Sequence, residues 1–335
     1  MRMTRCLKQV FGLTALLLAA PVVNGQPQGT MVDLGTLGGG QSWAMGINDR
    51  GQVVGAALTA LWERRAFLYA QGGMTNLGTL GGDDSIATGI NERGQVVGFS
   101  RIANGALHAF LWEAGRMKDL GTLGGPNSLA YAVNELGQVA GQSETARGEL
   151  HAFLWDTGRM LDLGTLGGTS SAAYALNNRG QVVGESAIAS GYRRAFLWQN
   201  GRMQDLGIVG TPTGFSRASG INDIGQIVGT YFGTDPHGFG FSGFLWEDGR
   251  MKALSSGGMC SAAQAINNPG QIAGHSSVCF VDGPAVMWDR GEVVYLGSLS
   301  TGPGYAAAIN NRGQIAGSTA AYLRDVDHAF LWAKK

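Results

Sequence analysis

The sequence predicts an all-β protein, a seven-bladed β-propeller with four-stranded blades. A nine-letter motif, first met as INDRGQVVG at 47–55, recurs seven times along the 335 residues. Its asparagine stands at positions 48, 91, 134, 177, 222, 267 and 310, so the period is 43 to 45 residues. Four-stranded propeller blades have about this length. Each end of the chain also holds the part of a blade that the other end lacks.

Each repeat contains four short segments with the apolar or alternating pattern of strands, named A to D in chain order. In the third repeat they cover 128–134, 137–143, 151–155 and 159–164. Beyond residue 25 the chain shows no apolar period of 3.6 residues with helix caps, so the sequence predicts strands throughout.

Turn chemistry accounts for the repeated motif. Asn, two polar residues and Gly form a type I turn closed by a glycine bulge, because Asn accepts from the backbone two residues on and Gly tolerates a positive φ. The motif is therefore the A–B hairpin, and its Asn and Gly have a structural role. WEAGRM at 112–117 predicts the same turn between strands C and D. Gln52 and its equivalents are predicted to satisfy backbone groups between blades or to line a channel.

The chain ends predict a closed ring. TMVDLG at 30–35 is a D strand with no C strand before it, and HAFLWAKK at 328–335 is a C strand with no D strand after it. Pairing them removes two exposed strand edges. Residues 26–335 are thus predicted to form seven blades, the last closed by the N-terminal strand.

Residues 1–25 have the organisation of a secretory signal peptide, with a basic start, an apolar run at 10–23 and small residues before Gln26. The run is shorter than the ~20 residues that span a bilayer. We expect cleavage, no later membrane insertion, and an extracellular or periplasmic monomer; an uncleaved anchor is the alternative. A formal net charge of zero without a Lys/Arg run gives no reason to expect a nucleic-acid partner.

The predicted mature chain retains two cysteines, Cys260 and Cys279, because Cys6 leaves with the signal segment. A lone pair in an oxidising compartment predicts a disulfide. Register counted from the turn at 267–270 places Cys260 opposite Val278, one residue from Cys279.

Three motifs together, HAFLW, DLGTLGG and GINxxGQVVG, resemble the HAF-repeat family of bacterial extracellular proteins. The resemblance covers essentially the whole chain after the signal segment. HAF stands at 108–110, 151–153 and 328–330, and DLGTLGG at 33–39, 119–125 and 162–168. The resemblance implies a secreted repeat protein and implies no particular activity.

The residue that opens strand C is basic in five repeats, and each time an Asp or Asn stands near the end of strand D in the same blade. The pairs are Arg65 with Asn76, His108 with Asp119, His151 with Asp162, Arg194 with Asp205 and, by ring closure, His328 with Asp33. This pattern predicts a repeated cross-strand polar pair. A simple register places Ala109 opposite Asp119, so the pairing is diagonal or joins neighbouring blades. A ring of histidine ligands is the alternative.

Sequence variation collects in the B–C and D–A loops, which share one face of the ring and favour binding there. The loop at 230–242 is the longest and most aromatic, and we expect a partly exposed contact surface in it. Packing of these aromatic side chains under their own loops is the alternative. The candidate ligand-binding residues are Tyr192, Arg193, Arg217, Tyr231, Phe232, Asp235, His237 and Phe239. Arg supplies a bidentate fork for sugar hydroxyls or carboxylates.

Two functions fit these observations. The first is a secreted, non-catalytic propeller that binds an extracellular glycan or protein. The second is a polysaccharide lyase or glycoside hydrolase in which His237 acts as a base, with Tyr231, Asp235 and Arg193 near one substrate atom. Signatures of common enzyme classes are absent, and the acidic pairs at 83–84 and 325–327 offer too few oxygens for calcium. No cofactor or metal is expected.

Overall fold

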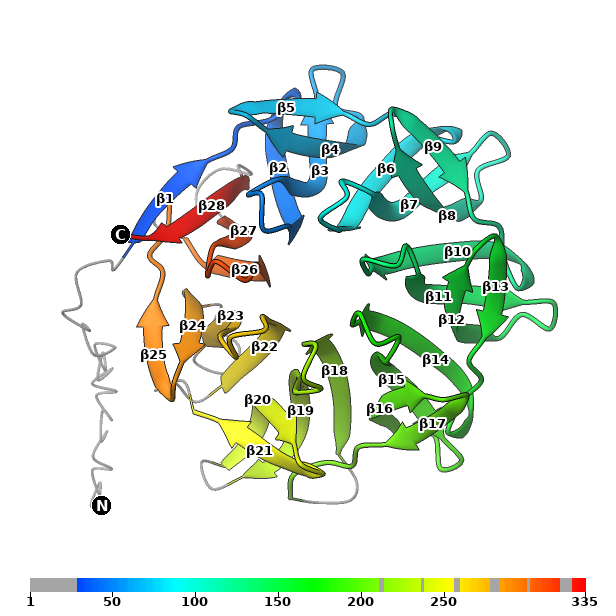
Figure 1. Cartoon of the computed structure of the whole chain (residues 1–335), viewed down its shortest axis with the longest axis vertical. Helices are drawn as coiled ribbons and strands as arrows, with labels where there is room; N and C mark the ends of the chain where they lie inside the picture. Colours follow the sequence, from blue (N-terminus) through cyan, green and yellow to red (C-terminus); the bar gives the residue numbers. More distant parts are fainter. Residues whose placement is uncertain are drawn as a thin grey trace, which may run out of the picture.

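The computed structural model describes residues 29–210, 214–235, 238–255, 260–277, 283–299, 302–319 and 327–335. Every regular element in these ranges is a strand, and the strands form seven four-stranded antiparallel sheets. The sheets stand around a central axis as the blades of a propeller (Figure 1). The protein is a seven-bladed β-propeller, as the repeat predicts.

The innermost strands of the seven blades are β2 (Gly38–Ile47), β6 (Gly81–Ile90), β10 (Gly124–Val133), β14 (Gly167–Leu176), β18 (Phe215–Ile221), β22 (Cys260–Ile266) and β26 (Gly304–Ile309). The second strands are β3 (Val53–Thr59), β7 (Val96–Ile102), β11 (Val139–Thr145), β15 (Val182–Ile188), β19 (Ile227–Asp235), β23 (Ile272–Ser277) and β27 (Ile315–Thr319).

The third strands are β4 (Arg64–Ala70), β8 (Leu107–Glu113), β12 (Leu150–Asp156), β16 (Arg193–Gln199), β20 (Gly238–Glu247), β24 (Ala285–Asp289) and β28 (His328–Lys334). The outermost strands are β5 (Gly73–Asn76), β9 (Arg116–Asp119), β13 (Arg159–Asp162), β17 (Arg202–Asp205), β21 (Arg250–Leu254), β25 (Glu292–Tyr295) and, in the seventh blade, β1 (Gly29–Asp33).

Ring closure follows the prediction. The N-terminal strand β1 pairs antiparallel with the C-terminal strand β28, from Gly29 opposite Lys334 to Asp33 opposite Phe330 (Figure 1). The next residue, Leu34, is buried, and its N–H donates to the carbonyl of Ala329 at 2.9 Å. The seventh blade is therefore shared between the two ends of the chain, and both receive a neighbour that covers a strand edge.

The core lies between blades. A Phe of the third strand is fully buried in six of the seven blades; these are Phe67, Phe110, Phe153, Phe196, Phe244 and Phe330. Phe153, for example, packs with Val97 and Ala109 of the second blade. Burying a side chain of this size contributes about 1.5–3 kcal/mol relative to its exposure to water. The apolar residues of the repeat thus pack each blade against its neighbour.

The two hairpins of a blade use different turns. In the A–B hairpin the N–H of Gly51 donates to Asn48 O at 3.0 Å, and Gly51 has a φ of 75°, as expected for a type I turn with a glycine bulge. The C–D hairpin has a two-residue loop in which both φ angles are positive, 49° at Ala114 and 81° at Gly115. This is the type I′ pattern, which matches the twist of paired strands. The prediction of one shared turn was wrong for the C–D hairpin.

Every innermost strand carries a register shift near its end, as at Ala263/Ala265 in β22. A bulge of this kind adds one residue to one strand of a pair. Cys260 therefore lies opposite Ser277, and not opposite Val278 as simple counting predicts. Cys279 lies outside the described residues, so its pairing with Cys260 stays a prediction.

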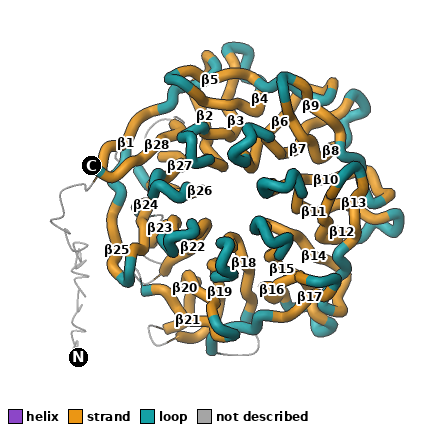
Figure 2. Tube along the Cα trace, in the orientation of Figure 1, coloured by secondary structure: helices purple, strands orange, loops and turns teal. Residues whose placement is uncertain are grey.

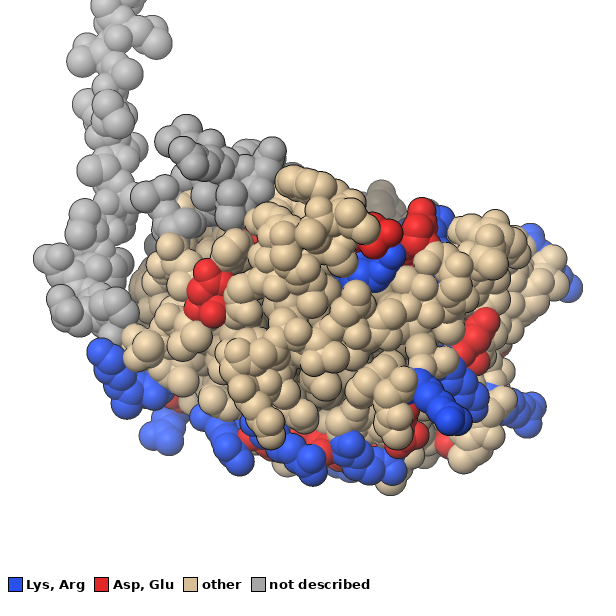
Figure 3. Space-filling model, turned by 90° about the horizontal axis from the view of Figure 1, so that it is seen from above, with Lys and Arg blue, Asp and Glu red and all other residues tan. Residues whose placement is uncertain are grey.

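The blades give the ring two unlike faces. One face, here the hairpin face, carries the A–B and C–D turns, and the inner turns surround the axis in Figure 2. The hairpin face, lowest in Figure 3, holds most of the Lys and Arg visible in that view, interspersed with Asp and Glu. The opposite face, here the variable face, carries the B–C and D–A connections.

Candidate functional site

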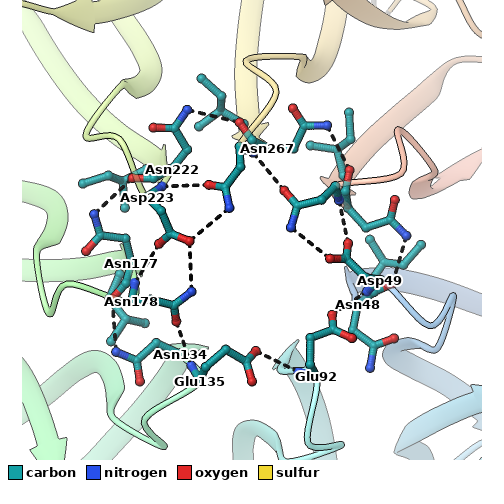
Figure 4. A pocket seen from close by; sticks show the side chains of 18 of the residues that line it. Asn48, Asp49, Glu92, Asn134, Glu135, Asn177, Asn178, Asn222, Asp223 and Asn267 are labelled. Carbon is teal, nitrogen blue, oxygen red and sulfur yellow. Dashed lines mark hydrogen bonds between the residues drawn. The ribbon is translucent and has the colours of Figure 1, made fainter.

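The hairpin face has a closed ring of asparagines at its centre (Figure 4). In each blade the Asn of the repeated motif donates from Nδ2 to the backbone carbonyl of the equivalent Asn in the next blade. The first bond runs from Asn48 to Asn91 at 3.1 Å, and the last returns from Asn310 to Asn48 at 2.9 Å. The members are Asn48, Asn91, Asn134, Asn177, Asn222, Asn267 and Asn310, all at most 4% exposed.

A second ring lies beside the first. The residue after each asparagine donates its backbone N–H to the side chain of its equivalent in the next blade, as Glu92 does to Glu135 at 2.8 Å. The ring comprises Asp49, Glu92, Glu135, Asn178, Asp223, Asn268 and Asn311. With the first ring it borders a polar cavity of about 230 Å³ on the axis (Figure 4). The side chains of this second ring accept the hydrogen bonds that join neighbouring blades.

The glutamine of the motif completes this network. Gln138 donates its backbone N–H to Asn134 Oδ1 and accepts from Asn134 Nδ2 at 2.8 Å. Its Nε2 then donates to Asp156 at the start of the C–D turn, at 3.1 Å. The predicted structural role of the Asn is confirmed, and the Gln holds two hairpins of one blade together.

The histidines also have a structural role. His108 Nδ1 lies 2.7 Å from Asp119 Oδ2, although the residue directly opposite Asp119 is Phe110. The same diagonal pair forms between His151 and Asp162 and, across the ring closure, between His328 and Asp33. Each of these Asp side chains also accepts the N–H of the Gly two residues on, as at Gly121 (2.8 Å). The predicted cross-strand pair is confirmed for the histidines and is diagonal within one blade.

The arginines at the equivalent positions differ. Arg65 binds the carbonyl of Asp83 and the carboxylate of Glu63, so its predicted pair with Asn76 was wrong. Arg194 is buried and reaches the carbonyl of Gly214. An Arg side chain is long enough to pass its own outer strand and reach the next connection.

Toward the variable face, side chains of different residue types contact one another between neighbouring blades. The Arg217 guanidinium on β18 lies over the Tyr174 ring of β14, 3.8 Å from its centroid. The Tyr174 hydroxyl donates to Glu185 at 3.2 Å, and Glu185 forms an ion pair with Arg193. The Tyr131 ring lies 5.3 Å from that of Tyr174. Tyr131, Tyr174, Glu185, Arg193 and Arg217 are called the Glu185 cluster.

Burial raises the pKa of both tyrosine hydroxyls in this cluster. It raises the pKa of Tyr131 to about 12, against a smaller opposing effect of the Arg217 charge. Burial also raises the pKa of Tyr174, and the nearby Glu185 carboxylate raises it further. Both phenols are therefore protonated at neutral pH, and the Tyr174 hydroxyl donates its proton to a hydrogen bond with Glu185.

Three phenylalanines of the fifth blade form the aromatic group, which comprises Phe215, Phe232 and Phe241. Phe215 stacks on Phe232 with ring centroids 5.9 Å apart, and Phe241 lies 4.8 Å from Phe232. Phe241 is 43% exposed. Phe215 and Phe241 line a cavity of about 200 Å³ together with Arg217, Ser219, Thr230 and Gln264. This cavity joins an aromatic wall to a cationic and an amide side chain.

The segment 230–242 is not a loop for most of its length. Strands β19 and β20 stay paired as far as Asp235 opposite Gly238, so the segment is an extended hairpin. Alternation along β19 then directs Tyr231 and Phe232 to opposite faces. Tyr231 is fully buried in the core with Ile227 and Phe244, and its assignment to the ligand site was wrong.

The remaining predicted residues divide into three groups. Arg193 and Arg217 meet in the Glu185 cluster, and Phe232 belongs to the aromatic group. Tyr192 is 44% exposed on the turn before β16, with the Arg194 guanidinium 5.9 Å from its ring centre. His237 and the side chains of Asp235 and Phe239 lie outside the described residues, so the predicted convergence on His237 stays a prediction.

Sequence reasoning missed several residues of the site. Tyr174, Glu185 and Phe215 stand in strands, whereas the prediction was based on variation among the loops. Comparing equivalent positions across repeats finds them: Glu185, for example, stands where the first repeat has Ala56 and the second has Phe99. Trp62 is also exposed, at 71%, on the variable face in the first blade. The described residues contain no group of three metal-binding side chains, and they include no helix long and apolar enough to cross a membrane.

Comparison with known proteins agrees with the fold. No protein-family model and no curated protein sequence matches the chain. The β-propeller domain of the Trilobed protease from Pyrococcus furiosus is similar with a TM-score of 0.58 at 10% identity, over 88% of this chain and 94% of that chain. A chain of the mitotic checkpoint complex gives 0.52 at 14% identity, over 99% of both chains. At these identities the similarity shows the propeller fold alone.

Proposed function

We propose that this protein is a secreted, non-catalytic propeller that binds a carbohydrate at the variable face. One observation carries the proposal: the exposed ring of Phe241 lies beside Arg217 and Gln264 in one cavity of about 200 Å³. Sugar rings have an apolar face that packs on an aromatic ring and hydroxyls that need hydrogen-bond partners. Ligand sites commonly combine aromatic walls with a few well-placed polar groups. The cavity is below the ~300–1,000 Å³ of drug-sized sites, which suits one sugar ring of a longer chain.

The Glu185 cluster supports binding over catalysis. A general base must be free to accept a proton near neutral pH. The phenols of Tyr131 and Tyr174 stay protonated there, because burial raises the pKa of both. Glu185 is held by Arg193 and by the Tyr174 hydroxyl. These side chains are suited to fixed hydrogen bonding.

A glycan array tests the proposal. We expect the wild-type protein to bind a defined set of glycans and the Phe241→Ala variant to lose at least tenfold in affinity for them. Leu136→Ala is the matched control, because Leu136 is also an exposed apolar residue (63%) but lies on the hairpin face. Products of the hits are then assayed for new reducing ends and unsaturated sugars. Turnover would favour the lyase or hydrolase alternative, and an array without hits would favour a protein ligand; either result contradicts the proposal.

The sequence supports the extracytoplasmic part of the proposal. Residues 1–25 are proposed to be removed as a signal peptide, and the rest to be a HAF-type repeat protein. We also propose the Cys260–Cys279 disulfide, which would close a loop of about 20 residues and contribute about 3 kcal/mol in the entropy model. Mass spectrometry of exported protein should give a chain that begins near Gln26 with no free thiol. An intact N-terminus or two free thiols would contradict this part.

A further inference from the structure

We infer that the glycan bound at this cavity is acidic, and that Arg217 binds its carboxylate. The inference rests on the proposed function, because it assumes that a glycan occupies the cavity beside Phe241. It names the chemical class of that glycan and the residue that selects it.

Arg217 is positioned but not neutralised. The residue is exposed, and the central carbon of its guanidinium lies over the Tyr174 ring, 3.8 Å from the ring centroid. Such cation–π stacking fixes the plane of a guanidinium and leaves its N–H edge available. Within the part of the chain that the structure describes, the Arg217 side chain forms no hydrogen bond or ion pair. The donors of this Arg are therefore preorganised and unused.

The carboxylate of the Glu185 cluster already has a partner. Glu185 shares the Tyr174 ring with Arg217, since the Tyr174 hydroxyl donates to it at 3.2 Å. Its charge is balanced by Arg193, which forms an ion pair with Glu185 Oε1. One cluster thus contains two arginines and one carboxylate, and the positive charge left over is that of Arg217.

The cavity presents this charge to a ligand. Of its described lining residues, Arg217 is the charged one, and Ser219, Thr230 and Gln264 are neutral. Phe215 and Phe241 supply an apolar wall on the fifth blade. The planar fork of Arg matches the two oxygens of a carboxylate and binds them by parallel charge-assisted bonds. A pyranose ring with a carboxylate substituent could pack on Phe241 while its carboxylate meets Arg217.

Paired oligosaccharides test the inference. The panel holds tetrasaccharides of galacturonate, glucuronate and mannuronate, each with its carboxyl-reduced neutral counterpart, and one sulfated tetrasaccharide. Binding is measured by titration calorimetry with the full propeller at 50 and 300 mM NaCl. We expect at least one uronate to bind tenfold or more tightly than its neutral counterpart, and this preference to fall at the higher salt concentration.

Two variants assign the preference to Arg217. Arg217→Gln should abolish the difference in affinity between each uronate and its neutral counterpart, and Arg217→Lys should restore only part of that difference, because a lysine lacks the fork. Equal binding of charged and neutral members would overturn the inference and leave the proposed function standing. Absence of binding to the panel and to the glycan array would overturn both. Preference for the sulfated member would overturn the carboxylate assignment.

Discussion

The same seven innermost strands build two unlike regions near the axis. At the hairpin face, one position is Asn in all seven blades, and its side chains close a ring. Three residues earlier on the strand, the equivalent positions read Met45, Thr88, Tyr131, Tyr174, Ser219, Gln264 and Ala307. The repeated Asn satisfies the backbone of every blade. The varied residues have different partners: the Thr88 hydroxyl donates to Ala130 O, the Ser219 hydroxyl donates to Ala263 O, and the Tyr174 ring lies under the Arg217 guanidinium.

The two regions differ in whether their polar side chains have hydrogen-bond partners. A buried amide must be paired, because leaving it unpaired costs about 1–3 kcal/mol. Asn134 makes bonds to Asn177 and to both the backbone and side chain of Gln138. Arg217, by contrast, is exposed and meets only the face of an aromatic ring among the described residues. The hairpin face uses its polar groups to join the blades, whereas the Arg217 donors have no partner among the described residues.

The largest expected effect comes from opening the ring. Deletion of residues 26–36 removes β1 and Leu34, so β28 loses the strand that covers its edge. We expect the variant to unfold or to oligomerise through that edge, and both regions near the axis to be lost together. Size-exclusion chromatography with light scattering distinguishes these states from a monomer. The chain from Gln26 to Lys335 is the control, and a monomeric deletion variant with an unchanged Tm would contradict ring closure.

Two aromatic residues of the β19–β20 hairpin sharpen the comparison between core and site. Tyr231→Ala should lower the free energy of unfolding by about 3–5 kcal/mol, because it empties a fully buried core position. Phe241→Ala, on the paired strand, should cost under about 1 kcal/mol because that side chain is half exposed. Chemical denaturation of both variants measures the contrast. Similar losses in the two variants would mean that the aromatic group is part of the core.

Much of this fold is predictable from the sequence because the Asn–Gly turn of the A–B hairpin recurs in all seven repeats. The period, the Asn–Gly turns and the two half-blades determine blade number and closure. The register near Cys260 was not predictable, because no residue type in the sequence marks the position of the β-bulge. The site was predicted only in part: Arg193 and Arg217 were named as donors beside the aromatic segment and do lie in the Glu185 cluster, but Tyr231 was misplaced. A tyrosine is compatible with a loop and with a buried strand. The pairing of β19 with β20 as far as Asp235 shows that Tyr231 stands in a strand.

The asparagine ring should show a medium effect. Asn134→Ala removes side-chain bonds to Asn177 O, Gln138 N, Gln138 Oε1 and Leu136 N, and leaves the buried Asn177 carbonyl and the part-buried Gln138 groups short of a partner. We expect a loss of about 2 kcal/mol in the free energy of unfolding. Leu136→Ala in the same hairpin is the control and should stay within about 0.5 kcal/mol. Calorimetric unfolding of both variants decides, and equal Tm values would remove the asparagines from the account of stability.

The smallest effect concerns pH at the second ring. Burial acts to raise the pKa of Asp223 and is the largest single influence, but the N–H of Asn178, the amides of Asn268 and Asn178, and the charge of Arg179 together lower it. Asp223 Oδ2 accepts both amides at 3.0 Å. A carboxyl whose pKa is lower in the folded state stabilises it above the unfolded pKa, ~3.9 for Asp. This contribution is lost as the pH falls through the folded pKa.

Asp223→Asn should therefore be less stable than the wild type at pH 7, because an amide NH₂ in place of Oδ2 would face two donors. The difference should shrink as the pH falls from 5 toward 2, where protonation of Asp223 in the wild type creates the same conflict. Thermal unfolding of both proteins at half-unit steps of pH measures the difference directly. Asn311→Ala provides a variant of the same ring without a carboxylate, and its difference from the wild type should change less over this range. A constant gap for Asp223→Asn would show that the Asp223 charge does not stabilise the ring.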